Sequence, residues 1–250
     1  VLELGATMLP GLQGDVAVPV KTTGGTGYWF AADGSDSITE STQVYAQRTL
    51  TPKFLGYLTD VSYKALLQST PALESLTRQD FIDGTAVTLD WAAVQGTGAS
   101  NQPTGVTSTS NINTVEYANA GSPTWANVVG MQTAIEADNA DQGVLRYLSH
   151  PTLAGTMRST DRGSDTGAYL WEGGMMNGLD AHTSANVPTG TCILADWSQL
   201  LIGMWGGIEI ATDPGGSNFA TGLVSFRSIA TIDLAVRHPE AFCTLTEAAP

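Results

Sequence analysis

Three histidines, His150, His182 and His238, are the side chains on which acid–base or nucleophilic catalysis would depend. A serine nucleophile of the α/β-hydrolase kind would lie in a Gly-x-Ser-x-Gly turn, and the sequence contains no such segment. His150 and His238 each precede a proline, which predicts roles in helix capping and in a turn. His182 lies in a Gly/Asn-rich segment, and we expect it to be exposed. The sequence therefore predicts a protein that is not an enzyme.

Metal and cofactor sites are not indicated either. The acidic segment from Asp33 to Glu40 offers oxygen ligands, but it lacks the spacing and the central glycine of a calcium loop. Gly96-Thr97-Gly98 lacks the third glycine of a dinucleotide-binding turn and follows a predicted helix rather than a strand. Cys192 and Cys243 have no metal-type spacing, and we expect two reduced, half-buried thiols. We expect no cofactor and no metal.

Charge is scarce in this chain, and its balance is acidic. The formal net charge is −14 with only 10 Lys and Arg residues, and charged residues make up 14% of the sequence, where about 25% is usual. The sequence has no cluster of Lys and Arg of the kind that displaces phosphate counterions, so we expect no specific binding of DNA. A surface with few charges suggests cover by other subunits. No run of about 18 apolar residues predicts a membrane span.

One long helix dominates the predicted elements, and it ends in a glycine-rich turn. Thr70 and Pro71 are typical of a helix start, and Gly96 and Gly98 are typical of a helix end. Gln102 to Gly105 then predicts a turn. Two apolar rows predict a wide buried stripe along the helix, and they comprise Ile82, Ala86, Leu89 and Ala93 with Val87, Trp91 and Val94.

Before this helix, the pattern predicts a strand at 15–20 that ends at proline, and a long exposed hairpin with arms at 28–31 and 42–50. A strand at 51–61 and a short helical turn at 62–68 follow. After the helix, we predict a linker at 107–120, a helix capped by Ser122-Pro123, a strand at 144–148 and a helix from His150 to Ser159. Further strands follow at 192–195, 200–205, 208–210 and 221–235. This order is typical of an α+β fold.

Six short motifs, in order along the chain, resemble the tailed-phage major capsid proteins of Hong Kong 97 type. Gly27 to Leu50 is similar to the extended loop of that family, and Leu50-Thr51-Pro52-Lys53 resembles its return strand. The remaining motifs are Ser62 to Ser69 before the long helix, Gly96-Thr97-Gly98 with Gln102 to Val106 after it, Ser149-His150-Pro151, and Ala195 to Ser198.

The resemblance implies a Hong Kong 97-type capsid fold with a peripheral domain, an axial domain and an extended β-hairpin loop. It implies an N-terminal segment at 1–26, the hairpin loop at 27–50, the peripheral domain at 51–118, the axial domain at 119–235, and a return to the peripheral domain with a C-terminal tail at 236–250. The residues expected to contact other subunits are Trp29, Asp33, Asp36, Glu40, Tyr45, Gly96, Gly98, Pro103, Asp213 and Gly215.

The resemblance also implies a structural role in a phage or prophage. Copies of the chain would assemble as pentamers and hexamers into an icosahedral shell that encloses double-stranded DNA. The expected location is the virion, assembled in the cytoplasm of the host bacterium, with a portal and a scaffold or maturation protease as further partners and no membrane.

Two departures from the family pattern and two alternatives remain. The charged scaffolding segment and N-terminal arm usual upstream are missing, which suggests cleavage, truncation or disorder. The predicted hairpin tip at 32–41 has no lysine, so the Lys–Asn cross-link of some relatives is not supported. Encapsulins share the fold. A secreted β-rich carbohydrate-binding or hydrolase module is the alternative that low charge and six tryptophans leave open.

Overall fold

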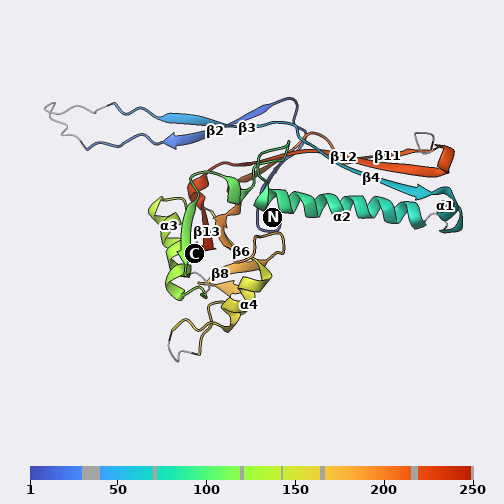
Figure 1. The fold of residues 1–250 in the computed structure, drawn as a ribbon. Coiled ribbons are helices and arrows are strands. Elements are labelled where there is room, and N and C mark those ends of the chain that lie inside the picture. The colour runs from blue at the N-terminus through green and yellow to red at the C-terminus, as the bar shows by residue number, and fades with distance from the viewer. Residues whose placement is uncertain are drawn as a thin grey trace.

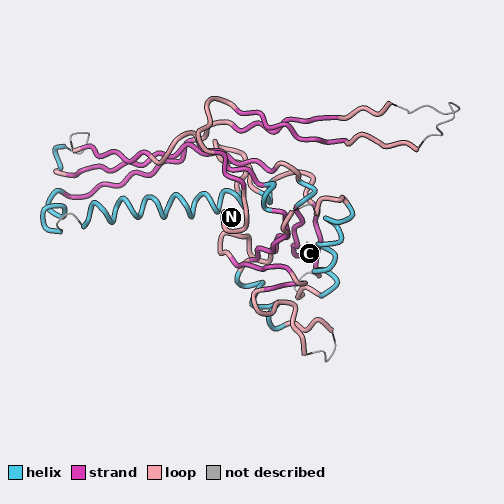
Figure 2. The backbone as a smooth tube through the Cα atoms, turned by 180° about the vertical axis from the view of Figure 1, so that it is seen from behind, coloured by secondary structure: helices cyan, strands magenta, loops and turns pink. Residues whose placement is uncertain are grey.

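The chain forms a six-stranded body, a long arm and a projecting two-stranded ribbon, as the computed structural model in Figures 1 and 2 shows. The structure describes residues 1–29, 40–69, 72–118, 121–141, 143–163, 167–214 and 219–248. Helices and mixed sheets occur together, which confirms the predicted α+β class.

The body is a six-stranded sheet with two helices against one face. In spatial order its strands are β5 (Asn113–Tyr117), β13 (Phe242–Glu247), β9 (Cys192–Asp196), β6 (Leu145–Ser149), β8 (Leu179–Thr183) and β7 (Met175–Met176). The helices are α3 (Trp125–Ala137) and α4 (Pro151–Ser159). Alternate residues of a strand point to opposite faces. Cys192 and Leu194 therefore pack in the core beneath the two helices, and Ile193 and Ala195 pack in the core on the other face.

The arm is built from one long helix and three strands. These elements are α2 (Ala72–Gln95), β4 (Phe54–Ser62), β11 (Glu209–Asp213) and β12 (Leu223–Val236). The first part of β12 pairs with β4 on one side and β11 on the other, and its last part pairs with β10 (Leu200–Met204), which pairs with β1 (Thr7–Leu9). The short helix α1 (Tyr63–Ser69) joins β4 to α2 at the far end of the arm (Figure 1).

Helix α2 rests on β4 through a narrow row of side chains. Tyr57 donates a hydrogen bond from its hydroxyl to the carbonyl of Gly84 at 2.7 Å, and its ring stacks on Phe81 with 6.1 Å between the ring centroids. Thr85 is buried in the same row, and its hydroxyl donates to the carbonyl of Phe81 at 2.7 Å. This bond to the preceding turn satisfies the hydroxyl and explains why a polar residue is tolerated there.

The wide apolar stripe predicted for this helix is confirmed from Leu89 to Val94 and is wrong in the preceding turns. Ile82 and Val87 are 44% and 59% exposed, and Ala86 is also exposed. Toward the end of the helix, Ala92, Ala93 and Val94 are buried and Leu89 and Trp91 are partly buried, in the core that α2 shares with the body. Before that point the buried residues are Phe81 and Thr85, which lie in the row that contacts Tyr57. Residues 70 and 71, the predicted helix start, lie outside the described residues.

The ribbon consists of β2 (Val16–Thr23) and β3 (Val44–Leu50). Strand β3 lies where the sequence predicts the second strand of the hairpin. The first strand was predicted at 28–31, but β2 comes earlier in the chain and continues through Pro19. Tyr28 and Trp29 are not in a strand, and residues 30–39 lie outside the described residues. Proline is tolerated in β2 because this strand has a partner on one side only and the missing N–H can face away from it.

Strand pairing also differs from the predicted grouping of the chain. We expected residues 119–235 to form one domain and 236–250 to return to the other. Instead β12 is the central strand of the arm, and β13 lies between β5 and β9 in the body. Strand β5, placed in the predicted linker, is therefore part of the body sheet. The described residues also form four short 3₁₀ helices, at Val106–Ser108, Trp197–Gln199, Phe219–Thr221 and Pro239–Ala241.

Helix α3 begins two residues later than Ser122-Pro123 predicts. Its N-cap is Thr124, whose side chain accepts from the Asn127 backbone while the Asn127 side chain accepts from the Thr124 backbone. We expect T124A to lower the free energy of unfolding by about 1 kcal/mol, because this reciprocal cap is lost. Urea denaturation with S122A as the control measures the effect. If S122A costs as much as T124A, the cap assignment is wrong.

Candidate assembly surfaces

The ribbon carries aromatic side chains that the chain itself does not cover. Trp29 is 104% exposed and Tyr45 is 62% exposed. Tyr45 donates a hydrogen bond to the Gln43 side chain at 2.7 Å, and Glu40 is exposed near the same end. Asp33 and Asp36 lie outside the described residues. Large exposed aromatics rimmed by polar groups are typical of contact surfaces.

The glycine-rich loop after α2 folds back onto the end of the helix. The amide of Gly98 donates to the carbonyl of Pro103 at 3.0 Å, and the amide of Gly105 donates to the carbonyl of Gly96 at 2.8 Å. Gly98 has a φ of +72°, the left-handed conformation expected at a helix end. The turn lies at residues 99–102, closed by the bond from the Gln102 amide to the Ala99 carbonyl, and so precedes the predicted position at 102–105.

All three contact residues predicted in this loop form hydrogen bonds within the chain, and two of them are buried or half-buried. Gly96 is buried, and a Cβ at this position would clash with the carbonyls of Ala92 and Pro103. Pro103 is half-buried and accepts the bond from Gly98. Gly98 and the turn beyond it are exposed. Gly96 and Pro103 therefore shape the loop, and the exposed turn is the part that a neighbouring molecule could reach.

The arm has one face against α2 and one open face. In the register of β4 with β12, Leu58 lies opposite Arg227 and Gly56 opposite Ile229, on the face away from the helix. Phe54 and Leu58 are 75% and 71% exposed there. The prediction of a strand at 51–61 did not include this open face. The signal was present, because residues at odd and even positions of a strand cannot face the same side.

Asp213 and Gly215 were predicted to form a loop tip. Asp213 ends β11 and is exposed, and it lies opposite Ser225 in the arm sheet. Gly215 lies outside the described residues. At the end of the arm nearby, α1 presents Tyr63 and Leu67, which are 58% and 68% exposed.

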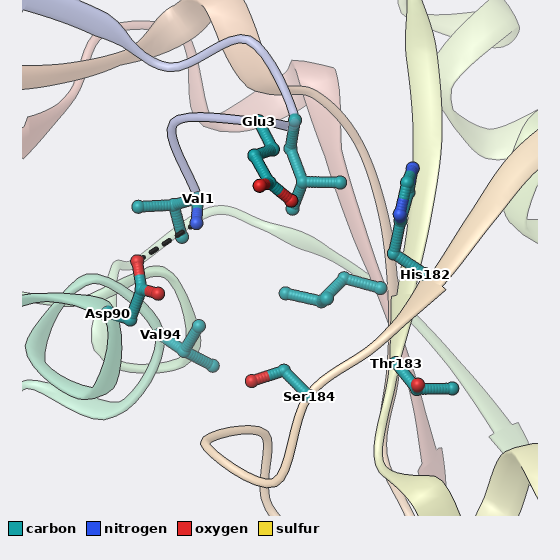
Figure 3. Close-up of a pocket in the computed structure, with 9 residues that line it drawn as sticks. Val1, Glu3, Asp90, Val94, His182, Thr183 and Ser184 are labelled. Atoms are coloured by element: carbon teal, nitrogen blue, oxygen red, sulfur yellow. Dashed lines mark hydrogen bonds and ion pairs between the residues drawn. The ribbon is translucent and has the colours of Figure 1, made fainter. Parts of the chain in front are cut away.

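A small cavity of about 160 Å³ lies where α2, the first residues and β8 meet (Figure 3). The amino group of Val1 forms an ion pair with Asp90 of α2 at 2.9 Å. Figure 3 shows the imidazole of His182 and the hydroxyl of Ser184 pointing in different directions across this cavity. Ser184 accepts a hydrogen bond from the Asn186 amide at 3.2 Å, so its hydroxyl is engaged in a local turn. The geometry offers no proton relay between these side chains.

The other residues considered for chemistry have structural surroundings. His150 caps α4, and its side chain accepts from the Thr152 amide, as the sequence predicts. His182 is exposed as expected, although it lies in β8. Burial lowers the pKa of His238, which precedes a 3₁₀ turn, and the neighbouring Arg237 lowers it further. Across the part of the chain that the structure describes, His, Cys, Asp and Glu form no cluster of three suited to a metal ion.

The two cysteines are free and fully buried in the body. They are more deeply buried than the half-buried thiols that the sequence predicts, because the sheet is covered on both faces. Burial raises the pKa of each thiol to about 12. No helix in the described part of the chain combines the length and the apolar character needed to span a membrane.

Comparison with known proteins identifies relatives of the whole arrangement. Residues 1–246 match the model of the phage capsid family. The major capsid protein of Halomonas phage phiHAP-1 is 31% identical over 239 residues, which cover 96% of this chain and 39% of that protein. The chain thus spans about two fifths of the length of this curated relative.

Solved structures show the same fold. A chain of the capsid of a native GTA particle matches with a TM-score of 0.81 at 17% identity, covering 99% of this chain and 90% of that one. Mycobacterium phage Adephagia matches with a TM-score of 0.76 at 18% identity, covering 100% and 90%. These matches confirm the predicted Hong Kong 97-type fold. They give no support to a carbohydrate-binding or hydrolase module. By its sequence match over nearly its whole length, the chain belongs to the phage capsid family, whose members are structural proteins rather than enzymes.

Proposed function

We propose that this chain is the shell-forming part of a major capsid protein. Copies assemble as pentamers and hexamers into an icosahedral shell around double-stranded DNA, in the virion of a phage or prophage. Assembly takes place in the cytoplasm of the bacterial host, with a portal and a scaffold or maturation protease as further partners. In the domain names of the fold, the arm corresponds to the peripheral domain, the body to the axial domain and the ribbon to the extended loop.

One observation carries this proposal beyond family membership: the chain exposes apolar side chains on two parts that extend in opposite directions. Tyr45 lies on the ribbon and Trp29 on the segment after β2, and Phe54 and Leu58 lie on the open face of the arm. Figure 1 shows the ribbon and the arm extending in opposite directions from the body. A contact between one patch and the other patch of a neighbouring copy is heterologous, and heterologous contacts form closed rings when the rotation between copies closes.

Many weak contacts of this kind are sufficient for a stable shell. Burying an exposed Leu or Phe side chain contributes about 1.5–3 kcal/mol. Each copy in a ring both gives and receives the contact, so the contributions add over the assembly by multivalency. Contact residues that we propose beyond these are Glu40, Gly98, the turn at 99–102 and Asp213.

Packaged DNA requires no binding site on this chain. The net charge is −14, so the protein lacks the excess of cations that non-specific DNA binding uses. The chain is therefore suited to enclosing DNA without holding it in place.

Sedimentation velocity and negative-stain electron microscopy of the purified chain test the proposal. We expect rings or closed shells of uniform diameter. A chain that stays monomeric, including when it is produced together with the remainder of its natural protein, would contradict the proposal.

The open face of the arm provides a sharper test. We expect the double variant F54S/L58S to fold with a free energy of unfolding within about 0.5 kcal/mol of the parent, because both side chains are exposed, and to lose most of its shells. The control F54L/L58M keeps both positions apolar and should assemble. Urea denaturation and particle yield by sedimentation measure the two effects. If F54S/L58S assembles like its control, this face is not a contact surface.

A further inference from the structure

The ribbon leaves the molecule at residues 12–15 and 50–53, and its first part also lies beside the body, where Val20 is buried and lines a cavity together with Arg48, Ala140 and His238. In the described part of the chain, β2 and β3 pair only with each other, and Figures 1 and 2 show them projecting away from the body. A two-stranded ribbon by itself is marginally stable in water. Its direction therefore depends on what holds residues 12–15 and 50–53, together with the body residues beside Val20 and Arg48.

The segment that follows β3 is held by a buried carboxylate. Asp233 of β12 has a side chain that is 3% exposed, and it accepts a hydrogen bond from the Thr51 amide at 2.9 Å. Its other oxygen forms an ion pair with Lys53 Nζ at 2.9 Å. The Ile232 amide donates to the Lys53 carbonyl at 2.9 Å. Three bonds thus fix the chain directly after β3.

The segment that precedes β2 is held by the end of β10, the strand that pairs with β12. The Leu12 amide donates to the Met204 carbonyl at 3.1 Å, and the Trp205 indole Nε1 donates to the Gly14 carbonyl at 2.7 Å. The Trp205 amide in turn donates to the Thr231 carbonyl at 3.1 Å. The segments before β2 and after β3 are therefore attached to the same end of the β10–β12 pair.

The two attachments meet at one cross-strand pair. Gly203 of β10 lies opposite Asp233 of β12. A Cβ on Gly203 would lie 2.9 Å from Leu12 Cδ1 and 3.3 Å from Leu50 Cδ1. Leu12, before β2, and Leu50, at the end of β3, therefore pack over Gly203. The cross-strand partner of Gly203, Asp233, holds Thr51 and Lys53.

We infer that Gly203, Trp205 and Asp233 form a clamp that sets the direction in which the ribbon leaves the body. This inference rests on the proposed function, because the ribbon is useful only if its exposed aromatics reach a second copy of the chain. At a rise of ~3.3 Å per residue, residues 16–29 reach at most about 45 Å, so a tilt of about 10° at the root moves the far end by about 8 Å. The three residues are therefore positioning residues: they direct the ribbon toward a second copy of the chain without contacting that copy themselves.

Distance measurement between spin labels tests the clamp on the unassembled chain. Labels on T42C, beside the ribbon strand β3, and A126C of α3 report the direction of the ribbon, and the native cysteines are too buried to react. We expect a single narrow distance distribution in the parent. D233N places an amide NH₂ against either Thr51 or Lys53 and so loses one bond, and W205F removes the indole donor. Each is expected to widen the distribution at least twofold.

Two further variants separate positioning from stability. D180N removes an exposed partner of Arg146 in the body and should leave the distribution unchanged. K53M removes only the ion pair with Asp233 and should also widen the distribution. This variant provides the test if D233N disturbs the fold. A merely stabilising role would lower the melting temperature without widening the distribution, and that result would overturn the inference. Shells should be lost in D233N and W205F and retained in D180N. A parent that forms no shells would contradict the proposed function and leave the distance test valid.

Discussion

Replacing Gly105 by alanine is expected to destabilise the chain by about 3 kcal/mol, which is among the largest effects of a single methyl group. A Cβ at this position would lie 2.6 Å from the Ala92 carbonyl oxygen, 2.6 Å from the Gly96 nitrogen and 2.8 Å from the Val94 carbonyl carbon. All three atoms belong to the backbone at the end of α2, so no side-chain rotation relieves the clash. Urea denaturation at neutral pH measures the loss.

Gly155 of α4 provides the matched control for the same substitution. A Cβ there meets no atom within 4 Å, and the residue lies inside a helix. Alanine is favoured over glycine in a helix by about 1 kcal/mol, so G155A should be neutral or stabilising. If G105A is as stable as G155A, the close contact between the loop and the helix end is not present in solution.

This contact also shows what the sequence could predict. Gly96 and Gly98 correctly predict the end of α2, because the left-handed φ of Gly98 is a local requirement. The reason for Gly96 and Gly105 is different: they allow two backbone segments to approach closely. Such an approach depends on where the loop returns, so residue types along the chain do not reveal it.

Some errors concern elements, because β13 was not predicted as a strand, but others concern partners. Strand β12 lies where the apolar run at 221–235 predicts it, yet the places of β12 and β13 in arm and body depend on pairing with β4 and β9, residues far away in the sequence. In the same way, the apolar residues Ile82 and Val87 are helical as predicted yet exposed, because they do not lie in the row of α2 that contacts β4. Local chemistry determines the elements, and the position of the partner determines which faces are buried.

The proposed assembly surfaces likewise include residues whose exposure was predicted from the sequence and residues whose exposure was not. The exposed aromatics Trp29 and Tyr45 were found because a long polar hairpin cannot bury them by itself. Phe54 and Leu58 were missed because their exposure depends on α2 covering the opposite face of β4. The clamp at Asp233 could not be predicted, since it joins residues 180 positions apart or more.

Alkaline pH is expected to destabilise the chain by several kcal/mol through its two buried thiols. Burial raises the pKa of Cys192 and Cys243 from an ordinary value near 9 to about 12. The unfolded chain loses these protons first, so stability is fully present below pH 9 and falls as the pH rises from about 9 toward 12. Each shift of about three units corresponds to about 4 kcal/mol once both states have titrated, and to about 2 kcal/mol per thiol near pH 10.5. Burial also raises the pKa of Tyr147, which adds to the loss at higher pH.

Urea denaturation at pH 8 and pH 10.5 in the presence of a reductant measures this loss. The double variant C192A/C243A is less stable at pH 8, because the cavity left by each sulfur costs packing energy. Its stability should nevertheless change much less between the two pH values, since the two titrating groups are gone. Y147F serves as the companion variant and should alter only the upper part of the pH range. A double variant that loses as much stability as the parent between pH 8 and 10.5 would show that the thiols do not control alkaline unfolding. Unfolding would then have to be attributed to charge repulsion on a chain whose formal net charge is already −14 at neutral pH.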